Sequence, residues 1–253
     1  MKLVLGVRSG HDRDDSLRFA AQLGVDGVMT GPGRDDTPNG YYEYPWLVSL
    51  KSHAEAYGLT LEAMSLLPWH LCYKWMLGLP GRDEQIENTL TSIRNMGAAG
   101  VPIMVFNMHA LRFYRTSNAV PDRAGALATG FEYERVKNAP LMTTGHGADM
   151  RLIPPEQRRR ISDEEMWANY TYFIKAAAPV AEEAGVKLAL HPDDPQVPEI
   201  AGVARIMRSP EAFRRALEIA DSPALGLKFC TGCFSQMGAD VEKEIRYFGG
   251  LGK

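Results

Sequence analysis

The 253-residue chain has little cysteine, little excess charge and no long apolar run. Three cysteines are an odd number in a chain of this length, which argues against a disulfide framework and favours a reducing cytoplasm. A formal net charge of -3, with Arg158–Arg160 as the one basic run, argues against a nucleic-acid partner. No stretch reaches the about 18 apolar residues of a membrane span. We therefore expect a cytoplasmic protein with neither nucleic acid nor membrane as a partner.

Several common catalytic motifs are also missing from the sequence. It has no serine nucleophile elbow, no G-x-x-x-x-G-K-[ST] phosphate loop and no G-x-G-x-x-G after an apolar run. The start of the chain has too short an apolar part for a signal peptide and lacks a cleavage site. The chemistry must therefore be sought in other residues.

What the sequence does contain is a regular alternation of strand and helix patterns. The predicted strands cover residues 2–8, 25–30, 59–67, 101–108, 187–190 and 224–229. The predicted helices follow them, the first capped by Asp14 or Asp15 and the others at 45–57, 83–99, 162–183, 209–220 and 240–248. Such alternation predicts an α/β fold with a parallel sheet and right-handed crossovers. We expect one domain over residues 1–253, a (β/α)8 TIM barrel type with about six βα units in this chain.

The alternation is interrupted once, after the fourth predicted strand. Residues 109–160 form a long irregular stretch rich in Arg, Gly, Thr and Tyr. A loop of this length within a compact domain is usually a lid, a binding element or a disordered segment. We interpret it as an insertion that acts as a lid.

The strongest local signal is the stretch Lys187–Pro195, KLALHPDDP. A short apolar run that ends in His191 predicts a buried strand stopping at the carboxyl-end rim, where α/β proteins bind ligands. The next predicted strand delivers Cys230 in the same way. Imidazole and thiolate are both ligands for divalent transition metals, so we predict a metal site of His191 and Cys230. The alternative is that His191 is an ordinary structural residue of the rim.

Other polar residues are expected at the same rim. We predict that substrate is contacted by residues near the ends of strands one, three, four and five and by one arginine of the insertion: Arg8, His11, His70, Asn107, Arg115 and Asp193. Each of them could instead be a solvated or structural side chain, and Asp193 could form an Asx turn after Pro192. Cys230 and Cys233 are formally a C-x-x-C pair, but neither a thioredoxin-like nor a zinc-ribbon context accompanies them.

These residues and their neighbours resemble a known family, the mannonate dehydratases of the xylose-isomerase-like barrel superfamily. HPDDP followed by a strand ending in CTG is the most specific part, and PWHLCYK and IRNMGAAGV are weaker likenesses. The resemblance implies a lyase that converts D-mannonate to 2-keto-3-deoxy-D-gluconate and water in hexuronate (glucuronate) catabolism. It implies Mn²⁺ as the cofactor, with Fe²⁺, Co²⁺ or Zn²⁺ possible, and we expect a homodimer or a higher homo-oligomer.

The resemblance also implies which residues hold the metal. His191 and Cys230 match two of the family's ligands, while a second His and an Asp are expected after Lys253. The residues that transfer protons are expected there too, so the catalytic residues remain unknown.

Two other functions are compatible with these residues. One is a metal-dependent sugar isomerase or epimerase on the same barrel, which would release no water. The other is a truncated, inactive barrel that binds a partner or a sugar acid, with its first and sixth strands exposed at the sheet edges.

Overall fold

The computed structural model describes residues 1–7, 13–33, 36–143 and 149–253. Its central feature is one six-stranded parallel sheet with the strand order β1-β2-β3-β4-β7-β10. The strands are β1 (Val4–Gly6), β2 (Gly27–Thr30), β3 (Thr60–Met64), β4 (Ile103–Asn107), β7 (Lys187–His191) and β10 (Leu225–Leu227). All six predicted strands are therefore present, each shorter than predicted or within one residue of the predicted length.

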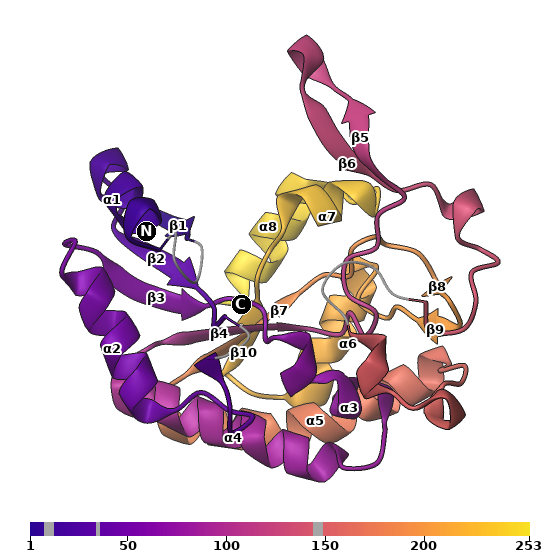
Figure 1. Cartoon of the computed structure of the whole chain (residues 1–253), viewed down its shortest axis with the longest axis horizontal. Helices are drawn as coiled ribbons and strands as arrows, with labels where there is room; N and C mark the ends of the chain where they lie inside the picture. Colours follow the sequence, from indigo (N-terminus) through magenta and orange to yellow (C-terminus); the bar gives the residue numbers. More distant parts are fainter. Residues whose placement is uncertain (8–12, 34–35, 144–148) are drawn as a thin grey trace.

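Helices lie between the strands and after the last one, and those along the bottom of Figure 1 cover the outer side of the sheet. They are α1 (Arg13–Leu23), α2 (Tyr44–Glu55), α3 (Tyr73–Leu77), α4 (Arg82–Ala99), α5 (Asp163–Ala184), α6 (Pro210–Ala220), α7 (Thr231–Gln236) and α8 (Val241–Gly250). The short helices α3 and α7 were not predicted. None of the helices in the described ranges is both long enough and apolar enough to cross a membrane.

The helix before β7 shows how local sequence sets the architecture. Ser162 caps α5 and forms a capping box with Glu165, as its spacing predicts. Gly185 ends the helix in the left-handed conformation, with φ +68°. α5 packs closely on α4, because a Cβ on Gly97 would lie 2.3 Å from the carbonyl oxygen of Ala184. This packing fixes where β7 begins, and so where His191 lies.

The sheet curls as a barrel wall does. The side chain of Lys228, just after β10, places its Nζ 3.8 Å from the Sδ of Met29 in β2, although three strands separate β2 from β10 in the sheet order. Within the described residues β1 pairs only with β2 and β10 only with β7, so both are edge strands. The predicted TIM-barrel type with six βα units is confirmed.

The insertion predicted at 109–160 lies between β4 and α5. It holds the hairpin β5 (Ser117–Pro121) and β6 (Leu127–Gly130), which projects away from the sheet (Figure 1), and the short 3-10 helices η3 (Arg123–Gly125), η4 (Tyr133–Arg135), η5 (Met150–Leu152) and η6 (Pro155–Gln157). A second small hairpin, β8 (Glu199–Ile200) with β9 (Val203–Ala204), meets the insertion through the hydrogen bond from Met142 N to Ala201 O, 2.8 Å. The role of the insertion as a lid stays a prediction.

Candidate metal and substrate site

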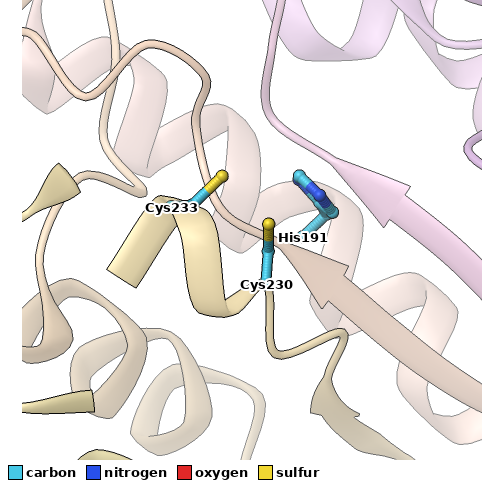
Figure 2. A group of neighbouring side chains, drawn as sticks. All are labelled: His191, Cys230 and Cys233. Atoms are coloured by element: carbon cyan, nitrogen blue, oxygen red, sulfur yellow. The ribbon is translucent and has the colours of Figure 1, made fainter. Parts of the chain in front are cut away.

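Two strand ends bring together three side chains with metal-binding atoms. His191 is the last residue of β7, Cys230 follows β10, and Cys233 lies in the first turn of α7 (Figure 2). One ligand atom from each residue lies within 4.8 Å of the other two. We call these three residues the thiol cluster. The cluster contains both predicted ligands, His191 and Cys230. Its third member, Cys233, was not predicted as a ligand.

A hydrogen bond to the backbone fixes the orientation of the His191 ring. Its Nδ1 lies 2.7 Å from the backbone oxygen of Pro192. A carbonyl oxygen can only accept, so Nδ1 is the donor of this hydrogen bond and Nε2 is the ring nitrogen available to a metal. A ring fixed in this way by a backbone carbonyl is the usual arrangement of a metal-binding histidine.

The two cysteines of the thiol cluster differ in charge. Hydrogen bonds from the Cys233 thiol and from His191 lower the pKa of Cys230 to about 4. The same contact with Cys230, together with burial, raises the pKa of Cys233 well above its ordinary value. The pair thus holds one thiolate and one thiol that donates to it, and all three cysteines of the chain are free.

Asn107 and His109 lie beside the thiol cluster. Asn107 ends β4 directly opposite His191 in the parallel register. Its Oδ1 accepts a hydrogen bond from the His109 N–H at 3.0 Å, while its buried Nδ2 has no partner among the described residues. His109 Nε2 donates to the Pro192 oxygen, and burial lowers the pKa of His109 well below its ordinary value. His109 is therefore a neutral buried residue, not a solvated lid residue.

Asp193, two residues after His191, belongs to a buried ion pair with Arg205. Asp193 is fully buried, and its carboxylate accepts from Arg205 at 3.2 Å and from the Met207 N–H at 2.7 Å. Arg205 also donates to the oxygens of Arg112 and Asp194. Burial raises the pKa of Asp193, while Arg205 and the Met207 N–H act in the opposite direction. We call Asp193, Arg205 and the Met207 N–H the Asp193 network.

This network bears on the role predicted for Asp193. Each of its carboxylate oxygens already has a protein donor, and the side chain has no exposed surface. In this conformation Asp193 holds the loop after β7, and its contact with substrate stays a prediction.

Arg115 was predicted to contact substrate, and in the structure it pairs with a carboxylate of the chain itself. Its guanidinium makes a two-pronged pair with Asp194, at 2.8 and 2.6 Å. Both residues line a cavity of about 490 Å³ that Thr129, Phe131 and Gln236 also border. The arginine thus joins the insertion to the loop after β7, and its contact with substrate stays a prediction.

Of the remaining predicted residues, only His70 lies within the described ranges, and it lies apart from this group. His70 lies in the short 3-10 helix η2 (Trp69–Leu71), with Nε2 3.1 Å from Thr37 Oγ1, and lines a separate cavity of about 200 Å³. Arg8 and His11 lie outside the described residues. The predicted substrate contacts therefore stay predictions.

Lys228 is a further charged residue that the sequence interpretation missed. It is two residues before Cys230, and burial lowers the pKa of its ammonium group. Side chains two residues apart in an extended chain lie on the same side. The position of Lys228, two residues before the predicted ligand Cys230, could therefore have predicted that it lies near the site. A lysine there can offer an anionic ligand a positive charge.

The thiol cluster fits a transition metal. Three atoms no more than 4.8 Å apart all lie within about 2.8 Å of a common centre, close to the about 2.3 Å of a zinc–sulfur bond and 2.0–2.1 Å of a zinc–nitrogen bond. Imidazole and thiolate suit Zn²⁺, Fe²⁺ and Co²⁺ better than they suit Mg²⁺ or Ca²⁺.

Comparison with known proteins gives a consistent picture. The family model described as D-mannonate dehydratase (UxuA) matches residues 1–252. The mannonate dehydratase of Streptococcus equi subsp. zooepidemicus is 34% identical over 247 residues, which are 93% of this chain and 66% of that protein. The chain thus spans slightly less than two thirds of the length of this relative.

Solved structures show the same likeness. The mannonate dehydratase of Streptococcus suis serotype 2 superposes with a TM-score of 0.80 at 32% identity, covering 98% of this chain and 69% of that one. A D-psicose 3-epimerase from Clostridium cellulolyticum H10 superposes with a TM-score of 0.54 at 13% identity, covering 94% and 70%. The second likeness is one of fold alone.

Proposed function

The chain belongs to the D-mannonate dehydratase family, and from this membership we propose that it is a metal-dependent hydro-lyase acting on D-mannonate. The products would be 2-keto-3-deoxy-D-gluconate and water. Because the chain spans only about two thirds of the length of the Streptococcus equi protein, its activity, substrate and partners belong to this proposal. The observation that carries it within the structure is the meeting of His191 and Cys230 at the ends of β7 and β10.

The reaction explains why such a site is needed. The substrate loses the proton on C2 and the hydroxyl on C3, and the resulting enol becomes the 2-keto product. A proton next to a carboxylate is weakly acidic, so negative charge that develops on the substrate oxygens must be stabilised. A bound divalent metal would supply this stabilisation as a Lewis acid.

The residues of this chain have distinct parts in this proposal. His191, fixed by the Pro192 oxygen, and Cys230 as thiolate would hold the metal. Mn²⁺ is the metal that the family resemblance implies, and Fe²⁺, Co²⁺ and Zn²⁺ also suit these ligands. Arg115 and Lys228 would bind the anionic end of the sugar acid, for which Arg115 must exchange Asp194 for the substrate carboxylate.

The unpaired amide of Asn107 has a place in the same proposal. A buried N–H without a partner costs about 1–3 kcal/mol, so a substrate oxygen that accepts from Asn107 Nδ2 would recover that energy on binding. The insertion would then close over the substrate and exclude water. Cytoplasmic location and a homo-oligomeric state, both expected from the sequence, stay predictions.

Product analysis tests the function directly. The protein, loaded in turn with Mn²⁺, Fe²⁺, Co²⁺ and Zn²⁺, is incubated with D-mannonate and the products are identified by mass spectrometry. The proposal predicts a keto acid that is lighter than the substrate by one water, formed by the native protein and by Cys72→Ser and not by His191→Ala. A rearranged sugar of unchanged mass would instead indicate an isomerase or epimerase, and no turnover with any metal would reject the proposal for this chain.

A further inference from the structure

Cys72 and Cys233 are both buried cysteines, yet their surroundings differ. The thiol of Cys72 lies near three backbone oxygens, those of Leu67, Pro68 and Trp69, at 3.3–3.9 Å. The thiol of Cys72 therefore has backbone oxygens as hydrogen-bond acceptors, as a structural cysteine does. The thiol of Cys233 meets Cys230 and the side chain of Gln196 instead, within the thiol cluster. Such neighbours are typical of a ligand.

From this difference we propose that Cys233 is a third ligand of the metal, so that this chain alone provides a Cys2His set. The inference rests on the metal site of the proposed function and adds a ligand to it. Two thiolates and one imidazole around a position left open for water or substrate form one of the known ligand sets of catalytic zinc. Cys233 thereby gains a role that its spacing in the sequence did not reveal.

The local fold provides the required geometry. Cys230 is the residue before α7 and Cys233 is the third residue of that helix, so one helical turn brings the two sulfurs to the same side. Figure 2 shows both sulfur atoms and the His191 ring gathered at the end of β7. β7 and β10 are paired in parallel, which fixes the distance between the two backbone segments that carry these ligands. His191 ends β7 and Cys233 lies within α7, while Cys230 is the N-cap residue that joins β10 to α7.

Metal binding would displace the proton of the Cys233 thiol. The second thiolate formed in this way has a consequence for the choice of metal. Sulfur ligands favour Zn²⁺, Fe²⁺ and Co²⁺ over the harder Mn²⁺. The native protein should therefore prefer Zn²⁺ or Co²⁺ to Mn²⁺ more strongly than Cys233→Ser does. This preference is measurable by competition between metals and needs no enzymatic turnover.

Cobalt absorbance tests the ligand directly. The reduced protein is titrated anaerobically with Co²⁺, and the near-ultraviolet thiolate-to-cobalt charge-transfer band is measured per bound ion. We expect Cys233→Ser and Cys230→Ser each to lose about half of this band or to lose Co²⁺ binding altogether, because each removes one of two sulfur ligands. Cys72→Ser removes a cysteine elsewhere and should keep the full band. A Cys233→Ser protein with the native band per ion, or a native protein that binds no Co²⁺, overturns the proposal.

X-ray absorption of the native protein loaded with Zn²⁺ is the second measurement, and it does not depend on any variant folding. Two sulfur neighbours at about 2.3 Å support the proposal, and one sulfur neighbour overturns it. The outcome is separate from that of the dehydratase assay. Two sulfurs in a protein that leaves D-mannonate unchanged would keep Cys233 as a ligand and reject the function, and one sulfur in an active dehydratase would do the reverse.

Discussion

The thiol cluster and the Asp193 network start two residues apart in the chain and differ in almost every physical respect. In the Asp193 network, both carboxylate oxygens have protein donors and the charges are buried together. In the thiol cluster, one ligand atom from each of the three residues lies within 4.8 Å of the other two. One short motif, HPDDP, thus serves both regions: Asp193 holds the loop through buried hydrogen bonds, and His191 is the residue that we propose as a metal ligand.

Removing Arg205 should have the largest effect on stability. Arg205→Ala leaves the Asp193 carboxylate buried and unpaired, so we expect a loss of about 3–5 kcal/mol in the free energy of unfolding. Chemical denaturation of the metal-free protein measures it. Arg160→Ala is the matched control, because the Arg160–Glu199 pair is largely exposed and should change stability by about 0–1 kcal/mol. Equal losses in both variants would refute the structural role of the Asp193 network.

Replacing His191 should affect metal binding more than folding. His191→Ala removes a ligand, so we expect metal affinity to fall by about 100-fold or more, equivalent to about 2.7 kcal/mol. The metal-free protein should lose only about 1 kcal/mol of stability, the net value of the hydrogen bond to Pro192. Calorimetric titration with Zn²⁺ and denaturation without metal measure the two quantities. If His191→Ala instead lost much stability and kept its metal affinity, His191 would be a structural residue and not a metal ligand.

The Arg115–Asp194 pair lies between the two regions and should give an intermediate effect. Arg115→Ala removes a charged hydrogen bond to the sugar acid, so we expect KM for D-mannonate to rise about 10-fold, or about 1.4 kcal/mol. Arg151, also in the insertion and 83% exposed in its side chain, provides the control Arg151→Ala. Steady-state kinetics give the values. An unchanged KM in Arg115→Ala would remove Arg115 from the substrate site.

The smallest effect is expected at the capping box of α5, whose residues belong to neither region. Ser162→Ala should cost about 1 kcal/mol of unfolding free energy, because one helix N–H loses its acceptor. Thermal or chemical denaturation at neutral pH measures it.

The same capping box gives a pH dependence. Hydrogen bonds from the Ser162 backbone N–H and from Arg159 lower the pKa of Glu165 below its ordinary value of 4.5. A carboxylate with a depressed pKa stabilises the fold above that ordinary value, and its contribution is lost as the pH falls through the folded-state pKa. The stability advantage of the native protein over Glu165→Gln should therefore be present at neutral pH and shrink in acid. Glu164→Gln, outside the capping box, is the control, and a constant advantage across the pH range would contradict the assignment.

Much of the fold could be predicted from the sequence because its signals are local. Ser162 with Glu165, Ser209 before α6 and Gly185 after α5 are caps whose chemistry depends on neighbouring residues alone, and all three are confirmed. The hairpin β5–β6 was not predicted, because its strands lack such a local signal. Its residues are mostly exposed, so no apolar alternation marks the strands.

The site was only partly predictable because it depends on contacts between distant residues. His191 and Cys230 were found from apolar runs that end in a ligand-type side chain. Cys233 was missed because no helix was predicted directly after Cys230, and its placement needs the first turn of α7. The burial of Asp193 could not be predicted, since it depends on Arg205, twelve residues farther along the chain.

Metal content per chain is the measurement that tests the central claim most directly. Elemental analysis is made after loading with Zn²⁺ or Mn²⁺ and removal of free metal, on the native protein, Cys72→Ser, His191→Ala and Cys230→Ser, each shown to be folded by circular dichroism. The account predicts about one ion per chain in the first two and a loss of that ion in the last two. Equal metal content in all four proteins, or no bound metal in the native protein, would contradict it.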